Sequence, residues 1–267
     1  MEIKRSILER TAAEFRRKAY VPYSGIPVAA VVLLSDGMIV PGVRVENASF
    51  SLTISAVQNA ITTAAMLCTD SRGIVAVYSD SVTKHGLPAS ISEIAGSTLI
   101  KQDDHYFTVP ELSENTNELQ LYDPFILFGP EPHATEHLNT TRAISGSAHT
   151  PESDFPVGCL LVTRDGRGIV GVNVEVSNWN DILCAERNAL GTAVTFSATD
   201  IQTIYVSAPK DPFASPCGAC RQVMVELAQQ AMVWMDRGKN PPLGEPCTAL
   251  LPYFFSGNTI PAANRHS

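Results

Sequence analysis

The feature that most constrains the fold is an internal repeat. When the sequence is shifted by 129 positions, it matches itself without a gap from Pro22 to Ala64. In this register GVRVE at residues 42–46 falls on GVNVE at residues 171–175. Chance does not place so many identities in one frame, so the repeat predicts two copies of one structural unit.

Both copies show the same predicted order of secondary structure. A leading helix precedes two strands joined by a turn, and an alanine-rich helix follows. In the second copy a strand, a helix and a strand come next. This order predicts a mixed sheet covered by helices, that is, a tandemly duplicated α/β fold. The expected helices are 3–18, 55–67, 135–147, 184–195 and 217–230, and the expected strands are 28–34, 38–45, 157–163, 168–174, 203–207 and 248–251.

The boundary between the copies is expected near residues 124–134. This stretch, PFILFGPEPHA, is interrupted by prolines and carries no apolar period. We therefore expect a first domain at residues 1–130 and a second domain at residues 131–267.

Composition excludes several classes of protein. The 19 basic and 27 acidic residues leave a formal charge of −8, which argues against a nucleic-acid binder. No apolar run approaches the roughly 20 residues of a membrane span. The charged, helix-patterned N-terminus lacks the apolar core of a secretory signal, so we expect a cytoplasmic protein without a membrane partner. In that compartment the six cysteines are expected as thiols or metal ligands.

Two cysteine motifs in the second copy indicate a metal site. CAER occupies residues 184–187 and PCGAC occupies residues 216–220, and each motif opens a predicted helix. A helix N-terminus favours the thiolate, and a two-residue spacing lets both sulfurs reach one metal. Three thiolates, from Cys184, Cys217 and Cys220, suit zinc. No fourth protein ligand stands at motif spacing, which is typical of a catalytic zinc with an open position.

The residues beside these cysteines suggest a proton carrier. Glu186 lies two residues after Cys184, near the metal without being a ligand, where a carboxylate can move a proton. Three thiolates on Zn²⁺ leave a net charge of −1. Arg187 and Arg221 follow the ligand-bearing segments and are expected to offset that charge.

These motifs, with the GVNVE strand upstream, resemble the zinc-dependent cytidine deaminases of pyrimidine salvage. The segment FPVGCLLVTRDGRGIVGVNVE and the tail ALLPYFFS extend the resemblance over most of residues 135–256. It implies a three-layer fold of a mixed sheet flanked by helices, with one Zn²⁺ per chain in the C-terminal domain. It also implies hydrolytic deamination of cytidine or deoxycytidine to uridine or deoxyuridine.

The resemblance carries roles over to individual residues. It implies that Glu186 shuttles the proton between the attacking water, the ring nitrogen and the leaving amine. Asn173 and Glu175 are implied to bind the ribose, and alternation along a strand puts them on one face. Phe155 and Phe255 are implied to pack on the base, the latter in its own or a neighbouring subunit. The remaining implied residues are the zinc ligands Cys184, Cys217 and Cys220, the substrate contact Ala185, and the supporting residues Arg187, Arg221 and Gln222.

The first copy lacks this chemistry. Ser55 and Val57 stand where the second copy has Cys184 and Glu186, and Arg44 stands in place of Asn173. Ala89 and Ser92 take the cysteine places of PCGAC. The sequence therefore predicts a degenerate first domain without zinc.

The first copy nevertheless keeps segments that the second copy has altered. Glu152 replaces the tyrosine of the family's P-Y-S, and VSNWND at residues 176–181 replaces NASYGL, whereas the first copy retains VPYS and ENASFSL. We hypothesise a division of labour in which the first copy supplies Ala48, Ser49 and Phe50 to the catalytic pocket. Because the family includes homotetramers of single domains, a homodimer of two-domain chains is expected to form a pseudo-tetramer.

Other interpretations remain open from the residues alone. The same chemistry could act on a modified nucleoside, or the fold could serve as a non-catalytic zinc-binding protein. Asn173 and Glu175 could be ordinary polar strand residues, and the two phenylalanines core aromatics. His133 and His137 lie in a polar segment and are expected on the solvated surface. Cys68, Cys159 and Cys247 occupy apolar runs and are expected in the core.

Overall fold

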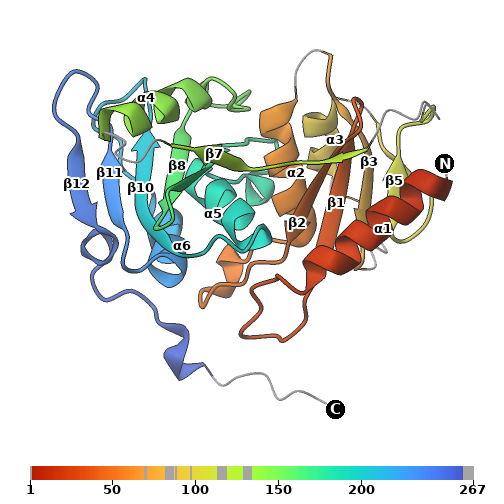
Figure 1. Cartoon of the computed structure of the whole chain (residues 1–267), viewed down its shortest axis with the longest axis horizontal. Coiled ribbons are helices and arrows are strands. Elements are labelled where there is room, and N and C mark those ends of the chain that lie inside the picture. The colour runs from red at the N-terminus through yellow and green to blue at the C-terminus, as the bar shows by residue number, and fades with distance from the viewer. Residues whose placement is uncertain are drawn as a thin grey trace.

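The computed structural model describes residues 2–68, 71–81, 87, 89–96, 98–112, 119–128 and 134–260. It contains two six-stranded sheets, one from each copy, which lie on either side of a central pair of helices (Figure 1). The duplicated α/β architecture predicted from the repeat is therefore confirmed. Among the described residues, no helix combines the length and apolar character needed to cross a membrane.

The elements of the first copy occur in the predicted order. Its helices are α1 (Glu2–Arg16), α2 (Ala56–Leu67) and α3 (Ala89–Ala95), with a 3₁₀ turn η1 (Phe50–Leu52). Its strands are β1 (Ala29–Leu34), β2 (Met38–Val43), β3 (Ile74–Ser79), β4 (Ile100–Lys101), β5 (Tyr106–Thr108) and β6 (Gln120–Leu121).

The second copy follows with longer edge strands. Its helices are α4 (Ala134–Ser145), α5 (Ala185–Thr195) and α6 (Gly218–Leu227), with 3₁₀ turns η2 (Trp179–Asp181), η3 (Cys247–Leu250) and η4 (Gly257–Thr259). Its strands are β7 (Phe125–Leu127), β8 (Gly158–Thr163), β9 (Arg167–Val172), β10 (Ile201–Ser207), β11 (Met232–Met235) and β12 (Leu243–Pro246).

The hairpin of each copy forms because its turn contains a glycine in the left-handed region. Gly37 has a φ of 95° and Gly166 a φ of 83°. The strand that enters the first hairpin, AAVVLL, is buried along its whole length, which fits a strand covered on both faces. In both copies the hairpin also lies close to the helix that follows it. In the second copy, a Cβ added to Gly171 would lie only 2.4 Å from the Ala189 nitrogen, so only glycine fits there. This glycine therefore lets α5 lie against β9.

The two sheets share their centre and differ at both edges, since β6 runs parallel to β2 whereas β7 runs antiparallel to β9. Their orders are β4-β5-β3-β1-β2-β6 and β12-β11-β10-β8-β9-β7. In the second copy β11 runs parallel to β10, as a β–α–β crossover through α6 requires. In the first copy β5 runs antiparallel to β3 and is reached through β4. The parallel crossover matters because it brings the N-terminus of α6 close to the N-terminus of α5.

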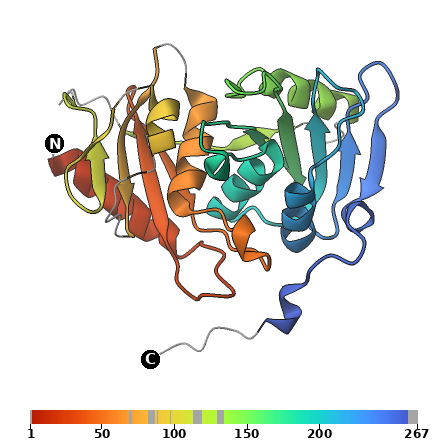
Figure 2. The ribbon, with the colours of Figure 1, turned by 180° about the vertical axis from the view of Figure 1, so that it is seen from behind.

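A pseudo-twofold axis relates the copies. Thr63 and Thr192, which are equivalent in the repeat, share a buried hydrogen bond of 2.9 Å. Gln58 Nε2 donates to the Asp181 carbonyl, and at the equivalent position Arg187 Nη2 donates to the Leu52 carbonyl. Helices α2 and α5 therefore pack on each other between the sheets, as both views show (Figures 1 and 2).

The copies also share core residues. Leu183 and Val194 of the second copy lie in the same buried cluster as Leu8 and Phe15 of the first. The chain passes between the sheets after β6, which pairs with β2, and before β7, which pairs with β9. The domain limit at 130/131 stays a prediction, while the strand pairing joins β7 to the second sheet.

One predicted element is wrong, and several were not predicted, namely α3, the strands β3 to β7, and β11 and β12. Residues 248–251 were expected to form a strand, yet residues 247–250 form the 3₁₀ turn η3. Leu250 and Leu251 pack against the second core from outside the sheet, a burial that an apolar run can reach in either conformation. The edge is instead built by β11 and β12, whose four-residue lengths give little periodic signal. The helix expected over 217–230 ends at Leu227.

Candidate metal centre and active site

Three cysteine sulfurs meet where the helices α5 and α6 begin. Cys184 is the N-cap of α5 and Cys217 is the N-cap of α6, while Cys220 lies in the first turn of α6. The three Sγ atoms all lie within 4.8 Å of one another, and those of Cys184 and Cys217 are 3.9 Å apart. The structure thus brings together the three residues that the sequence selected.

The donor set fits a tetrahedral zinc ion. Zn–S bonds of about 2.3 Å place two sulfurs of a tetrahedral site roughly 3.8 Å apart, close to the observed separation. The backbone N–H of Cys220 points to the Cys217 sulfur at 3.5 Å. Arg187 Nε, close in sequence to Cys184, is buried and has no hydrogen-bond partner among the described residues. Cys184, Cys217 and Cys220 could therefore hold the ion.

Hydrogen bonding within the cluster favours a thiolate at Cys217. A hydrogen bond from the Cys184 thiol, with help from Cys220 and from backbone N–H groups, lowers the pKa of Cys217. The bond to Cys217 raises the pKa of Cys184 to about 12, because Cys184 then acts as the donor. A bound divalent cation would favour thiolates at all three positions.

Glu186 lies directly beside the sulfurs. Its side chain is buried with only 3% of the residue exposed, and Oε2 accepts a hydrogen bond from Cys220 Sγ at 3.2 Å. Burial raises the pKa of this carboxyl, although hydrogen bonds from its own backbone N–H and from Cys220 oppose the shift. A carboxyl with a raised pKa can both take up and release a proton near neutral pH.

A cavity of about 240 Å³ joins these groups to several predicted substrate contacts. Besides the cysteines and Glu186, it is lined by Phe155, Asn173 and the buried Ala185. The walls opposite come from the ends of β10 and β11 and from the loop before α6. This is the concave, mostly apolar form of a small-molecule site.

The amide of Asn173 shapes the cavity wall. Its Nδ2 donates to the Phe155 carbonyl at 2.9 Å, and its Oδ1 accepts from the Val157 N–H at 2.8 Å. Glu175 does not line the cavity but accepts two hydrogen bonds from Ser153, from its N–H at 3.0 Å and its Oγ at 2.6 Å. In this structure both side chains fix the loop that carries Phe155.

Phe255 lies away from the cysteine cavity of its own chain. It is 53% exposed, and Gln222 holds its backbone through a donated bond of 2.8 Å and an accepted bond of 3.3 Å. Phe255 lines a separate hollow with Tyr23 of the first copy. Gln222 therefore orients the C-terminal segment.

The loop of Ala48, Ser49 and Phe50 contacts the second copy outside the cavity. The Ala48 N–H donates to Glu226 on α6 at 2.8 Å, and Phe50 packs edge-on against Tyr23. None of these three residues lines the cysteine cavity within one chain. Their supply to a catalytic pocket stays a prediction.

Arg221 positions the loop that precedes Cys217. Its guanidinium donates to the Pro216 carbonyl at 2.7 Å, to Ser215 Oγ at 2.9 Å and to the Leu250 carbonyl at 3.1 Å. Arg187 instead reaches across the pseudo-twofold axis to the Leu52 carbonyl at 3.2 Å. Both arginines thus anchor the segments that carry ligands.

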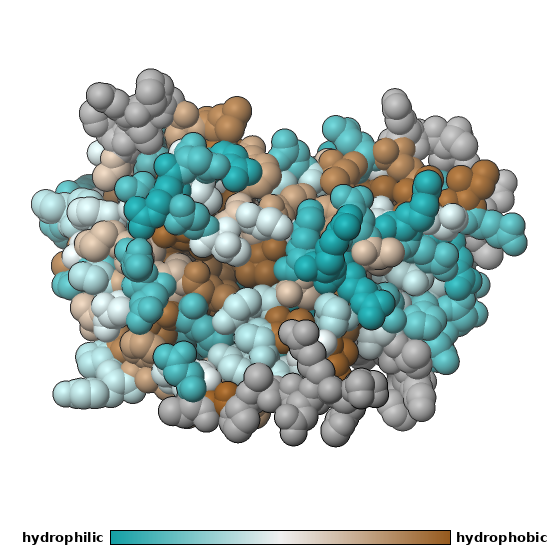
Figure 3. Space-filling model, turned by 60° about the horizontal axis from the view of Figure 1, so that its bottom comes forward, coloured by the Kyte–Doolittle hydropathy of each residue, from teal (hydrophilic) through white to brown (hydrophobic). Residues whose placement is uncertain are grey.

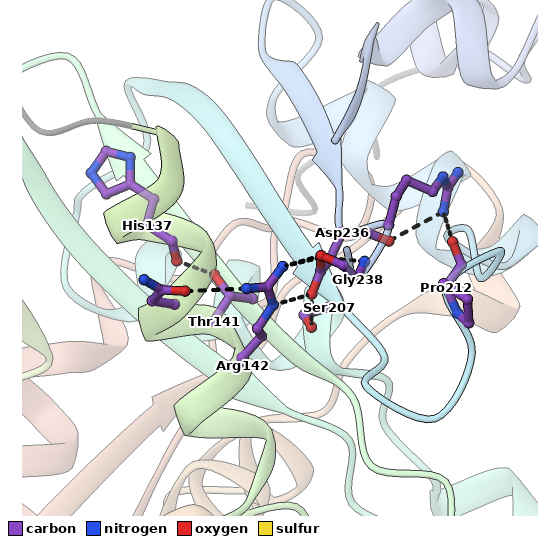
Figure 4. A network of polar contacts seen from close by, with 9 residues as sticks. His137, Thr141, Arg142, Ser207, Pro212, Asp236 and Gly238 are labelled. Atoms are coloured by element: carbon purple, nitrogen blue, oxygen red, sulfur yellow. Dashed lines mark hydrogen bonds and ion pairs between the residues drawn. The ribbon is translucent and has the colours of Figure 1, made fainter. Parts of the chain in front are cut away.

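Sequence reasoning missed Asp236, which also lines the cavity. Figure 4 shows Arg142 extending from α4 to this carboxylate, with two contacts of 2.6 Å, and Ser207 Oγ donating to it at 2.8 Å. Burial opposes ionisation of Asp236, yet the hydrogen bonds from Arg142, Ser207 and Gly238 lower its pKa. An acidic residue directly after the apolar run MVWM was the available signal.

The expectation for His137 was wrong. The residue is 4% exposed and lies between the rings of Phe128 and Tyr205, at centroid distances of 4.4 and 4.8 Å. Burial lowers its pKa. The polar sequence around it hid the inward face of α4, and His133 falls outside the described residues. Of the cysteines expected in the core, Cys159 and Cys247 are buried and Cys68 is partly buried.

Comparison with known proteins identifies the family. Two family models described as the cytidine and deoxycytidylate deaminase zinc-binding region match residues 133–236 and 1–79, which together make up more than half of the chain. The chain belongs to this deaminase family. The match to residues 1–79 covers the copy that lacks the cysteines, so both copies are domains of this family. The family is described by its zinc-binding region, and Zn²⁺ is its cofactor.

Each of the following relatives matches less than half of this chain. The chain is 37% identical over 110 residues to a cytidine deaminase of Sporosarcina psychrophila, covering 41% of this chain and 81% of that one. It is 42% identical over 87 residues to a probable cytidine deaminase of Dictyostelium discoideum, covering 32% of this chain and 59% of that one. A crystal structure of cytidine deaminase from Burkholderia pseudomallei is similar to 46% of this chain and all of that one, with 32% identity and a TM-score of 0.45.

Proposed function

We propose that the chain catalyses the hydrolytic deamination of cytidine and deoxycytidine to uridine and deoxyuridine. One observation carries this proposal: three cysteine sulfurs and a buried carboxyl converge on one cavity at the starts of two helices. The chain is similar to proteins named cytidine deaminases, which supports this substrate class.

The reaction needs one group that moves protons. Zinc, when bound by the three cysteines, supplies Lewis acidity that makes a water molecule acidic near pH 7. Glu186 takes the proton from the attacking water at its carboxylate and delivers it to the ring nitrogen. It then takes the proton of the newly formed C4 hydroxyl and passes it to the leaving amine as the C4–N bond breaks, so water and cytidine yield uridine and ammonia. The burial that raises the pKa of Glu186 supports this double use.

Substrate orientation follows from the cavity walls. Phe155 packs beside the base, and Ala185, at the first turn of α5, contacts it from the helix. Asn173 and Glu175 bind the ribose. Both side chains already form hydrogen bonds to the loop of residues 153–157, so they must either share these bonds with the sugar hydroxyls or exchange them for bonds to the sugar. A site that reads the sugar in this way prefers a nucleoside to a free base.

A homodimer completes the pocket in this proposal. Phe50 and Phe255 are 65% and 53% exposed, and apolar side chains lie among polar ones on the face that carries the C-terminal segment (Figure 3). Aromatic side chains at a surface favour an interface. Two chains would form a four-domain body in which the partner supplies Phe255 and the loop of Ala48, Ser49 and Phe50 to the cysteine cavity.

The cellular setting follows from the chemistry. Three thiolate ligands persist in a reducing compartment, so we place the enzyme in the cytoplasm and its role in pyrimidine salvage. The net charge of −8 supports a small-molecule substrate in preference to a polynucleotide.

The test is loss of absorbance on mixing zinc-replete protein with cytidine, alongside Glu186→Gln. Turnover in the wild type that falls by about 10²–10⁴-fold in the variant, with zinc content unchanged, supports the enzyme and its proton carrier. Absence of turnover with one zinc per chain would contradict the proposal. Modified nucleosides and then a non-catalytic zinc-binding role would be tested next.

A further inference from the structure

The first copy contains a cavity of about 420 Å³, larger than the cysteine cavity of the second copy. Both cavities are formed by the same positions of the repeat. Five equivalent pairs line them, namely Val28/Val157, Arg44/Asn173, Ser55/Cys184, Ala56/Ala185 and Val57/Glu186. The larger cavity is therefore the repeat counterpart of the deaminase cavity, and it persists although the residues of the metal centre have been replaced.

Its inner end has lost the groups that react. Ser55 replaces a cysteine, and its hydroxyl caps α2 by accepting the Gln58 N–H at 3.1 Å. Val57 replaces the proton-carrying glutamate. Ile61 and Ile91 are buried in the wall of this apolar end. A flat heterocycle can be buried here without meeting a metal ligand or a carboxyl at these positions.

Its other end carries polar groups. Arg44 stands at the position of Asn173, and its Nη2 pairs with Glu46 Oε1 at 3.1 Å. Ser79 and Ser81 add hydroxyl groups to the same lining. Because the charge of Arg44 is already balanced by Glu46, this end favours the neutral hydroxyls of a sugar over a phosphate.

The second copy contributes to the wall of this cavity. Asp181 is among its lining residues, and its carbonyl accepts from Gln58 Nε2 at 3.1 Å. Ser177 binds Glu93 on α3 through its N–H at 2.9 Å and its hydroxyl at 2.5 Å. The loop 176–181, which departs from the family sequence, therefore contacts the first copy's cavity.

We propose that this cavity is a second, non-catalytic nucleoside site. The base would occupy the apolar end near Val57, and the sugar would face Arg44 and the serine hydroxyls. A volume of about 420 Å³ lies in the range of roughly 300–1,000 Å³ of small-molecule sites. The choice of a nucleoside rests on the proposed function, because it is taken from the equivalent cavity of the second copy.

Equilibrium dialysis of the full chain with labelled uridine, the expected product, tests this site. The wild type should bind two uridines per chain. Val57→Trp fills the cavity and should remove one, whereas Val57→Thr preserves the volume and should keep both. Ile94→Trp, from α3 in the same lining, repeats the test if Val57→Trp fails to fold. The deamination rate of cytidine should change by less than twofold in the Val57 variants.

The deciding result is binding that disappears in Val57→Trp and persists in Val57→Thr, whether or not the chain deaminates cytidine. Wild-type binding of a single uridine that Val57→Trp leaves intact would overturn the second site while deamination still stood. Equal loss in both Val57 variants would overturn it as well. Tighter binding of cytidine monophosphate than of uridine at this site would overturn the nucleoside assignment.

Discussion

The two cavities show how one scaffold separates architecture from chemistry. In the second copy the N-cap Cys184 makes no capping hydrogen bond with its side chain, which leaves the sulfur available to a metal. In the first copy the N-cap Ser55 turns its hydroxyl to the helix. The same hydrogen bond holds the loop before the first hairpin strand in both copies, since Glu46 accepts from the Ser24 N–H as Glu175 accepts from the Ser153 N–H. This loop and the capped helix therefore form in the first copy without the metal ligands.

The largest expected effect comes from giving the second copy the residue of the first. Cys184→Ser should abolish stoichiometric zinc binding and lower the deamination rate at least about 100-fold, because two thiolates hold the ion poorly. Metal analysis after dialysis and a cytidine assay measure both. The matched variant Ser55→Cys should gain no zinc. Full zinc content in Cys184→Ser would show that this cysteine is not a ligand.

The ion pair of Asp236 with Arg142 lies at the second cavity, whereas the first cavity carries the pair of Arg44 with Glu46. Removing the charge of Asp236 therefore tests a feature of the second cavity alone. Asp236→Asn should lower the free energy of unfolding by about 3 kcal/mol at pH 7, because Arg142 would lose its buried partner. The depressed pKa of Asp236 stabilises the fold above the unfolded value of about 3.9, and this contribution is lost as pH falls through the folded pKa.

Urea unfolding at pH 7 and near pH 3 measures this difference. The gap between wild type and Asp236→Asn should narrow at the acidic end. Arg142→Gln is the partner variant, and a double mutant should cost less than the sum of the two single changes. An equal gap at both pH values would contradict a role for the ionised carboxylate.

A buried asparagine pair compares the copies across the pseudo-twofold axis. Asn59 Nδ2 contacts the Val43 and Gly191 carbonyls and Thr195 Oγ1, whereas the amide of Asn188 is buried without a hydrogen-bond partner among the described residues. Asn59→Leu should destabilise the chain by about 2 kcal/mol. Asn188→Leu should be neutral or stabilising. Equal losses by urea unfolding would break this asymmetry.

Phe50 tests whether the first copy serves the catalytic pocket. Phe50→Ala should raise KM for cytidine several-fold, equivalent to about 1 kcal/mol, without loss of zinc, because the exposed ring would pack in a partner's pocket. Steady-state kinetics measure KM, and Ile26→Ala is a matched control at another exposed apolar residue of the same copy. An unchanged KM would remove the proposed division of labour.

The smallest effect concerns His137, whose repeat equivalent is the buried Leu8. Because burial lowers the pKa of His137, its neutral form stabilises the fold above the unfolded value of about 6.5, and stability falls as pH drops below it. His137→Leu should flatten this dependence by less than about 1.4 kcal/mol per pH unit, the limit for one proton. Thermal unfolding between pH 5 and 7.5 measures the slope. A slope like that of the wild type would contradict the assignment.

The sequence predicted those parts of the site that depend on local patterns. Cys184 and Cys217 lie at the starts of two helices, which the apolar periodicity of the sequence predicts. Glu186 follows Cys184 within the first turn of α5. The repeat register makes Thr63 and Thr192 equivalent, but only the structure shows that they meet on the pseudo-twofold axis. Phe255 and the loop of Ala48 could not be placed, because their positions depend on contacts between copies and, in our proposal, between chains.

By itself, the sequence determined the duplication, through a constant shift of 129 positions, and the α/β class and the metal-binding motifs, through local spacing. Only the tertiary structure decided the antiparallel β5 of the first copy, the burial of His137 and the place of Asp236 in the cavity wall. These features arise where segments distant in the chain meet. Their free energy comes from contacts that no local pattern encodes.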